Sequence, residues 1–278
     1  MRILGAMLGG TISSYNSSGT VMLGAPLFAC GVLLEKFPSH EFVFPQFETY
    51  SSEDATPYLY RAAVKKIVDE ASGFDGILIT HGTDTCAFFA QLVARVLGVL
   101  DIPFVITGSM KSPDIDPDEA SGNLAFAVRC LEEGRSGVVF RNAEGREQLY
   151  GAHLIMSPDI NGIYSEYSEG IVPEKKDHTE FLTREELPKI LVIPSVPGSV
   201  IPDEGFDRVL ICCNHSGTAS VHLVPMVERW TARGIECFMA PVPASGGVYE
   251  SRRRLREAGA IELTGMPVEG AWSEVLLR

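Results

Sequence analysis

Two stretches of the sequence place threonine hydroxyls at points where an apolar run ends. Thr11 follows two glycines after the run 2–7, and Thr83 and Asp84 follow the run 76–80. A threonine hydroxyl becomes a nucleophile when a base removes its proton and a pocket stabilises the resulting oxyanion. Two threonines on facing loops, with a carboxylate beside one of them, therefore suit attack on a small amide.

Ordinary turns explain each stretch about as well when it is taken alone, because Thr, Asp and Gly are common turn residues. Nucleotide-binding motifs fit neither stretch. Gly5 and Gly10 have the Walker A separation, but Thr11 stands where the phosphate-binding lysine belongs. No G-x-G-x-x-G sequence follows a predicted strand. We therefore expect no nucleotide at these loops.

A cluster of Cys212, Cys213 and His215 raises the question of a metal site. The three residues lack the spacing of metal ligands. Adjacent residues on a strand point to opposite faces, so the two cysteines cannot face one ion. The sequence predicts no metal centre.

Short β-branched runs alternate with helical patterns along most of the chain. Strands are predicted at 2–7, 76–80, 104–107, 137–140, 189–193, 208–213 and 236–240, and helices at 57–72, 85–97, 119–133 and 222–232. This alternation is typical of α/β proteins with parallel strands buried on both faces. Ligands of such sheets bind beyond the carboxyl ends of the strands. Both threonine loops occupy that position.

The length of 278 residues indicates about two domains. Residues 166–189 interrupt the alternation, because they are highly charged, contain two prolines and lack a core strand. We predict a larger N-terminal α/β domain over 1–167, a linker over 168–188 and a smaller C-terminal α/β domain over 189–278.

Composition excludes several classes of function. The formal net charge of −13 and the isoelectric point near 4.9 argue against nucleic-acid binding, which needs a basic face. No segment is long and apolar enough to span a bilayer, and the N-terminal run has no small-residue cleavage site. The six cysteines show no C-x-x-C spacing. They are expected to be reduced core thiols of a cytoplasmic protein.

Three local predictions concern residues near the loops and near the C-terminus. Thr85 is expected to cap the helix that begins after it. His81 is expected to be a structural histidine at a strand end rather than a general base. The run Arg252 to Arg254 is expected to be the exposed start of a helix.

The paired motifs "GGTI" at 9–12 and "HGTDT" at 81–85 resemble the signatures of the L-asparaginase/glutaminase family of the bacterial type with two α/β domains. The likeness covers nearly the whole chain. Similar stretches are "YSSEDATP" at 50–57, "PFVITGSMK" at 103–111, "EASGNLAFAV" at 119–128 and "VYESRRRLREAGAIELTGMPVEGAW" near the C-terminus.

The resemblance implies hydrolysis of the side-chain amide of asparagine or glutamine through an acyl-enzyme. It makes Thr11 the usual candidate nucleophile and assigns catalytic roles to Thr83 and Asp84. It places Ser52 and Glu53 on the α-carboxylate and α-amino group of the substrate. Gly82 and Tyr15 complete the expected substrate-binding residues.

The resemblance also implies that no cofactor or metal is needed and that active sites lie between subunits of a homodimer, often paired into a homotetramer. The loop 216–220 would then reach the site of a neighbouring subunit.

This chain departs from the family pattern at three positions. In the stretch "GAHLIMS" at 151–157, Met156 stands at the position of a catalytic lysine and His153 at that of an arginine. Tyr15 follows Thr11 more closely than the family's flap tyrosine does, and Thr218 replaces the partner subunit's asparagine. The lysine is understood to tune the second threonine, so its loss raises the question of a substitute. His153 is an unlikely substitute, because residues three apart on a strand point to opposite faces. Lys111, on the turn after a neighbouring predicted strand, is the better candidate.

These observations leave three functions open. The leading hypothesis is an amidohydrolase acting on asparagine, glutamine or a related small amide. The alternatives are a hydrolase of a specialised substrate other than asparagine, and a catalytically impaired regulatory protein that binds an amino acid. Retention of both threonines and Asp84 favours an enzyme, whereas Met156 favours the alternatives.

Overall fold

The computed structural model describes residues 1–245 and 247–278, and the chain folds into two compact units. The N-terminal unit comprises Met1–Glu166 and Pro173–Leu182, and the C-terminal unit comprises Tyr167–Val172 and Thr183–Arg278. Residues of the predicted linker are therefore divided between the units. Within the described chain, no helix combines the length and the apolar character needed to cross a membrane.

The N-terminal unit is built on a six-stranded sheet with the order β4-β1-β5-β6-β7-β8. The first five strands in this order are parallel, and β8 is antiparallel to β7. The strands are β1 (Arg2–Met7), β4 (Glu41–Val43), β5 (Gly76–Thr80), β6 (Phe104–Thr107), β7 (Gly137–Arg141) and β8 (Glu147–Tyr150). Their apolar runs are buried because helices cover both faces.

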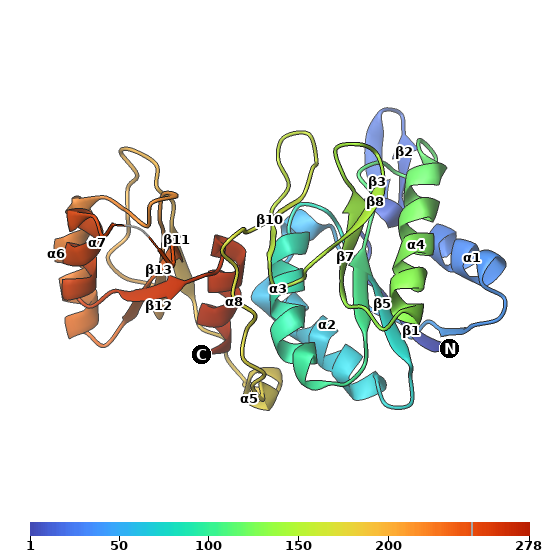
Figure 1. Ribbon diagram of the computed structural model, residues 1–278, viewed down its shortest axis with the longest axis horizontal. Coiled ribbons are helices and arrows are strands. Elements are labelled where there is room, and N and C mark those ends of the chain that lie inside the picture. Colours follow the sequence, from blue (N-terminus) through green and yellow to red (C-terminus); the bar gives the residue numbers. More distant parts are fainter. Residues whose placement is uncertain (246) are drawn as a thin grey trace. The chain divides into compact units, whose positions relative to one another are not determined.

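Two helices cover each face of this sheet (Figure 1). α1 (Leu27–Lys36) and α4 (Pro117–Glu132) pack together on one face, and α2 (Pro57–Glu70) and α3 (Cys86–Val96) lie on the other. The first face buries Leu78 and Val105 of the sheet against Leu124 of α4. Smaller elements are the hairpin β2 (Ser14–Ser17) and β3 (Thr20–Leu23), the pair β9 (Ile155–Met156) and β10 (Ser165–Glu166), and α5 (Thr179–Thr183).

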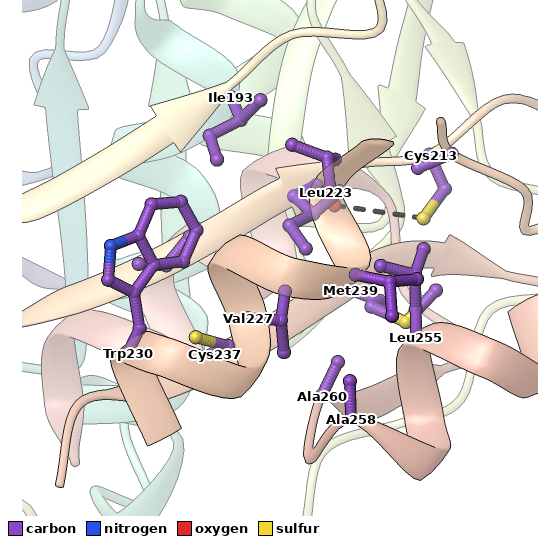
Figure 2. Packing of buried hydrophobic residues seen from close by; sticks show 14 of the residues in the cluster. Ile193, Cys213, Leu223, Val227, Trp230, Cys237, Met239, Leu255, Ala258 and Ala260 are labelled. Carbon is purple, nitrogen blue, oxygen red and sulfur yellow. Dashed lines mark hydrogen bonds between the residues drawn. The ribbon is translucent and has the colours of Figure 1, made fainter. Parts of the chain in front are cut away.

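The C-terminal unit is a four-stranded parallel sheet in the order β11-β12-β13-β14. Alternate residues of β12 point to opposite faces, as the strand geometry requires. Val209 and Ile211 pack with Trp230 in the cluster of Figure 2, whereas Leu210 packs with Val275. The elements are β11 (Ile190–Ile193), β12 (Arg208–Cys212), β13 (Glu236–Val242), β14 (Ile261–Thr264), α6 (Val224–Ala232), α7 (Glu250–Glu257) and α8 (Val268–Leu277).

The predicted class, an α/β protein of two domains with a mostly parallel sheet, is confirmed. All seven predicted strands and all four predicted helices are present, and β1, β5 and β6 have the predicted bounds. The prediction for the arginine run is wrong at Arg252. This side chain is 8% exposed and forms two hydrogen bonds to the carboxylate of Glu262 on β14, at 2.9 and 3.0 Å. Its aliphatic stem is buried while its charge is paired.

Candidate active site

The loops after β1 and β5 begin side by side and then diverge. The two strands are paired as far as Met7 and Thr80. The chain continues from β1 toward α1 and from β5 toward α3, which cover opposite faces of the sheet. Loops that diverge in this way leave a crevice at the strand ends, where open parallel sheets bind ligands.

Gly10 and Gly82 make a close backbone crossing in this crevice. A Cβ atom added at Gly10 would overlap the N and Cα atoms of Gly82, and one added at Gly82 would lie 3.2 Å from Cα of Gly10. Gly10 also has a φ of +81°, a conformation that favours glycine. Thr11 and Thr83 each follow one of these glycines directly, so the crossing brings the two threonine loops together.

Residues 50–54 are a third segment that packs against the crossing. The backbone N–H of Tyr50 donates to Leu8 O at 3.1 Å, which attaches this segment to the end of β1. A Cβ atom at Gly82 would lie 2.7 Å from Cβ of Ser52. Ser52 is 2% exposed, whereas the following Glu53 is exposed to solvent.

The hydroxyls of the two threonines are available to a ligand. Thr11 and Thr83 are half-buried, and neither side chain hydrogen-bonds to another residue within the described ranges 1–245 and 247–278. Buried hydroxyls usually have partners. The nearby carbonyl of Gly10, by contrast, accepts hydrogen bonds from Ser13 N at 2.9 Å and Ser14 Oγ at 3.0 Å.

Asp84 is held beside Thr83 by the buried Ser52. The Ser52 Oγ donates to the Asp84 carboxylate at 3.3 Å and accepts the Asp84 backbone N–H at 3.2 Å. The carboxylate is otherwise exposed. The structure thus brings together Thr11, Gly82, Thr83, Asp84 and Ser52.

Thr85 lies at the predicted N-terminal end of α3 but does not cap the helix with its side chain. Its hydroxyl donates to Ser52 O at 2.8 Å and accepts from the Tyr60 hydroxyl at 2.6 Å. The capping prediction was wrong about this hydroxyl, because long-range partners compete with the local backbone donors for it.

His81 is a structural histidine, as predicted. The ring is fully buried and stacks on Phe89 with 4.6 Å between ring centroids. Nδ1 lies 2.8 Å from Gly82 O, and Nε2 lies 3.2 Å from the Tyr50 hydroxyl. Burial lowers its pKa to about 4, so the ring is neutral near pH 7. The neutral tautomer with hydrogen on Nδ1 satisfies both contacts and positions the Gly82 carbonyl.

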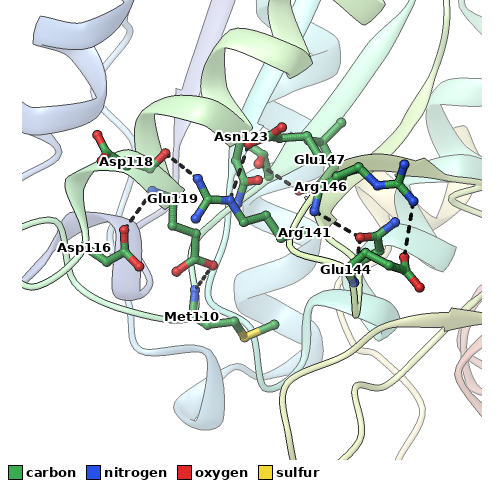
Figure 3. A network of polar contacts seen from close by, with 12 residues as sticks. Met110, Asp116, Asp118, Glu119, Asn123, Arg141, Glu144, Arg146 and Glu147 are labelled. Atoms are coloured by element: carbon green, nitrogen blue, oxygen red, sulfur yellow. Dashed lines mark hydrogen bonds and ion pairs between the residues drawn. The ribbon is translucent and has the colours of Figure 1, made fainter.

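The turn after β6 is fixed by side chains of α4 (Figure 3). The Glu119 carboxylate accepts the N–H groups of Met110 at 2.9 Å and Lys111 at 3.2 Å, and Asn123 Nδ2 donates to Gly108 O at 2.9 Å. Residues 119 and 123 are four apart and share one helix face. These hydrogen bonds join the stretches 103–111 and 119–128 in the folded chain.

Lys111 itself is directed toward α4. Its Nζ lies 3.5 Å from the carboxylate of Asp116, the N-cap of that helix, and the side chain is 59% exposed. Within the described chain it has no hydrogen bond or ion pair with Thr83. The structure therefore gives no support to Lys111 as the substitute for a lysine at position 156.

The hairpin that carries Tyr15 stands next to the crossing but leaves this ring 50% exposed. The hairpin is tied to the loop after β6, because Asn16 N donates to the carboxylate of Asp114 at 2.8 Å. Tyr15 has no side-chain hydrogen bond within the part of the chain that the structure describes.

Met156 is half-buried in β9, where it pairs with Ser165 of β10. His153 does not share this strand. Residues 151–154 form a turn in which Leu154 N donates to Gly151 O at 2.9 Å. The argument that His153 and Met156 point to opposite faces of one strand was therefore wrong, because the strand begins only at Ile155.

Thr218 belongs to the loop after β12 in the C-terminal unit. Its carbonyl accepts Asn214 N at 2.8 Å, and its hydroxyl lies 3.0 Å from Ser216 Oγ. These bonds define a tight turn within that unit.

Sequence reasoning missed the tyrosines that support the crossing. Tyr164 donates its hydroxyl to Thr83 O at 2.7 Å, and Tyr60 donates to the Thr85 hydroxyl. Tyr164 lies 81 positions from Thr83, so no local pattern could have indicated the contact.

The fold and the site define an α/β protein with paired threonines at the ends of adjacent parallel strands. Residues 2–145 match the family model described as Asparaginase, N-terminal. The chain therefore belongs to the asparaginase family, a family of amidohydrolases.

Similar proteins include a glutamyl-tRNA(Gln) amidotransferase subunit from Haloquadratum walsbyi, 26% identical over 247 residues that cover 76% of this chain and 55% of the relative. Its counterpart from Thermococcus kodakarensis is 26% identical over 80% of this chain and 58% of its own length. The chain thus spans less than two thirds of these curated relatives.

Two solved structures share the fold. A probable cytoplasmic L-asparaginase from Campylobacter jejuni superposes with a TM-score of 0.75 and 19% identity, covering 99% of this chain and 93% of the other. The thermostable L-asparaginase from Thermococcus kodakarensis gives a TM-score of 0.72 and 20% identity, covering 100% and 92%.

Proposed function

We propose that this protein hydrolyses the amide of a small amino-acid amide, such as asparagine, glutamine or a related metabolite, through a threonine ester. The observation that carries the proposal is the crossing of Gly10 and Gly82. It joins two threonine loops whose hydroxyls have no partner in the described chain, and Asp84 stands beside one of them.

In the proposed reaction the Thr11 hydroxyl attacks the amide carbonyl and loses its proton. Collapse of the tetrahedral intermediate breaks the C–N bond, and the nitrogen leaves with that proton as ammonia or an amine. Water then cleaves the ester and restores the hydroxyl. Thr83 polarises the carbonyl or assists the proton transfer. The buried Ser52 keeps Asp84 in place for the substrate.

The charge of the crevice supports substrates with a free α-amine. Asp84 and Glu53 both carry exposed carboxylates, and Ser52, which directly precedes Glu53, hydrogen-bonds to Asp84. Two like charges near each other are stabilised by a ligand ammonium group, which offsets their repulsion. We expect weak binding of N-acetylated substrates, and equal turnover of an N-acetylated and a free amino acid amide would contradict this assignment.

An ammonia-release screen tests the proposal. It compares asparagine, glutamine, their D-forms and a panel of small amides. Thr11→Val and Thr83→Val should each lower turnover by about 10⁴-fold or more, in the range found when a nucleophilic unit is disrupted. Thr20→Val, at the exposed first residue of β3, is the matched control and should retain turnover. Full activity of Thr11→Val removes Thr11 from the mechanism.

A second candidate is a hydrolase with a specialised substrate other than asparagine. Met156, which can neither carry charge nor move a proton, favours it. Turnover of a panel amide without turnover of asparagine or glutamine would select this candidate. Calorimetric binding of an amino acid without ammonia release would select a regulatory protein instead.

We also propose a homodimer or homotetramer with shared sites in the cytoplasm. The six free cysteines are compatible with a reducing compartment. The similar proteins named as amidotransferase subunits raise a further possibility, namely transfer of the released nitrogen to an acceptor. Sedimentation of the active protein tests the assembly, and an active monomer would refute shared sites.

A further inference from the structure

The peptide group between Thr83 and Asp84 is hydrogen-bonded at both ends. Its carbonyl, Thr83 O, accepts the Tyr164 hydroxyl at 2.7 Å. Its N–H, on Asp84, donates to Ser52 Oγ at 3.2 Å. The two partners hold opposite edges of one peptide plane, because the C=O and N–H of a trans peptide point in opposite directions.

Tyr164 is itself firmly placed. The residue is 2% exposed, and its ring packs on Phe140 with 4.6 Å between centroids and lies 6.3 Å from the ring of Tyr150. Burial holds the pKa of the Tyr164 hydroxyl well above its usual value of 10, so the group is a hydrogen-bond donor throughout the neutral range.

The opposite partner is supported in turn. The Ser52 carbonyl accepts the Thr85 hydroxyl at 2.8 Å, and that hydroxyl accepts from Tyr60 at 2.6 Å. Tyr60 and Ser52 are both buried. The partners on either side of the peptide are thus attached to the packed interior of the N-terminal unit.

We propose that Tyr164 is a positioning residue for the second threonine. Together with Ser52 it fixes the plane of the Thr83–Asp84 peptide, and this plane sets the directions of the Thr83 hydroxyl and the Asp84 carboxylate. The proposal rests on the proposed function for its catalytic consequence. Tyr164 immediately precedes β10, and β10 pairs with β9, the strand that contains Met156. The segment that carries Met156 is therefore linked to the Thr83 loop through the neutral hydroxyl of Tyr164.

The test is Tyr164→Phe, which removes the hydroxyl and keeps the ring in its stack. Thr83 O then loses its donor, and the peptide can rotate away from the orientation that suits the substrate. We expect kcat per folded protein to fall about tenfold, with KM raised because Asp84 is also displaced. A loss of packing alone would lower the folded fraction and leave both constants of the folded protein unchanged.

Tyr150→Phe is the matched control. Tyr150 is 3% exposed and its ring lies beside the ring of Tyr164, but its hydroxyl has no hydrogen bond within residues 1–245 and 247–278. This variant should keep kcat and KM within about twofold of wild type. In an active wild type, an unchanged kcat for Tyr164→Phe overturns the positioning role.

Amide hydrogen exchange separates this proposal from the proposed function. Exchange of the Asp84 N–H should be about tenfold faster in Tyr164→Phe than in wild type or Tyr150→Phe, whether or not the protein turns over an amide. If wild type releases no ammonia from any substrate, the proposed function fails, and the exchange rate of the Asp84 N–H alone tests the positioning role. In that case, equal exchange rates in Tyr164→Phe and wild type overturn the positioning role of Tyr164.

Discussion

Substitution of Gly10 by alanine gives a direct test of the backbone crossing. The added Cβ atom would lie 2.7 Å from the carbonyl carbon of His81 and closer still to Gly82. Ordinary carbon contacts are about 3.5 Å, so one loop must move by about 1 Å. These neighbours are backbone atoms, which cannot rotate away as the end of a side chain can.

The expected cost has two parts. Alanine at the φ of +81° and ψ of −175° of Gly10 costs about 1–3 kcal/mol, and overpacking of a closed site typically costs about 1–3 kcal/mol more. We therefore expect Gly10→Ala to lower the free energy of unfolding by about 2–6 kcal/mol, measured by urea denaturation. A displacement of 1 Å at a catalytic site can cost about 10²-fold in rate, so kcat/KM for ammonia release should fall at least that far.

Gly145→Ala separates strain from collision. Gly145, in the turn between β7 and β8, has a φ of +73° and no atom within 4 Å of an added Cβ. It should lose only the roughly 1–2 kcal/mol of backbone strain and retain activity. Equal destabilisation by the two variants, or wild-type activity in Gly10→Ala, would refute the crossing.

Three further outcomes follow from the site. The pKa of His81 is about 4 in the folded protein and near 6.5 in the unfolded chain. Its contribution of about 3 kcal/mol to the free energy of unfolding is therefore complete above pH 6.5 and is lost as the pH falls toward 4. Urea denaturation should show that the free energy of unfolding falls less on acidification in His81→Gln than in wild type, and that it falls as in wild type in the exposed His222→Gln. Thr85→Val should lower the free energy of unfolding by about 1–3 kcal/mol, because it removes the hydrogen bond from the Tyr60 hydroxyl and the one to Ser52 O, and recovery in Thr85→Ser would identify the hydroxyl as the cause. Met156→Lys should raise turnover of asparagine at least about tenfold if only a proton-transfer group is missing. An unchanged rate would show that Met156 does not occupy the position of the family's lysine.

The sequence predicts the frame of this protein better than the contacts within it. The apolar runs of β5 and β6 end at Thr80 and Thr107, and the run of β1 is followed closely by two glycines, so the strand bounds and the position of the loops follow directly. β14 and α8 were missed, because charged or polar residues interrupt the apolar ones in both: Glu262 in β14, and Glu269 and Ser273 in α8. The role of Thr85 could not be predicted, since its partners lie on Ser52 and Tyr60.

The site residues show the same division. Thr11 and Thr83 are found from their glycines and their place after strands, because this signal is local. The crossing itself, and the peptide held by Tyr164, depend on pairs of segments that only the folded sheet brings together. Lys111 illustrates the opposite error, since its position on a nearby turn suggested a role while its ammonium group pairs with Asp116.

The contact of Tyr164 with Thr83 has a consequence for synthesis of the chain. When the Thr83 loop emerges from the ribosome, 81 residues must still be added before the Tyr164 hydroxyl can reach its carbonyl. At about 5–20 residues per second, this leaves roughly 4–16 seconds in which both threonines exist on a nascent chain without that support. A translation product stopped before residue 164 would carry every predicted catalytic side chain and still lack the ordered loop.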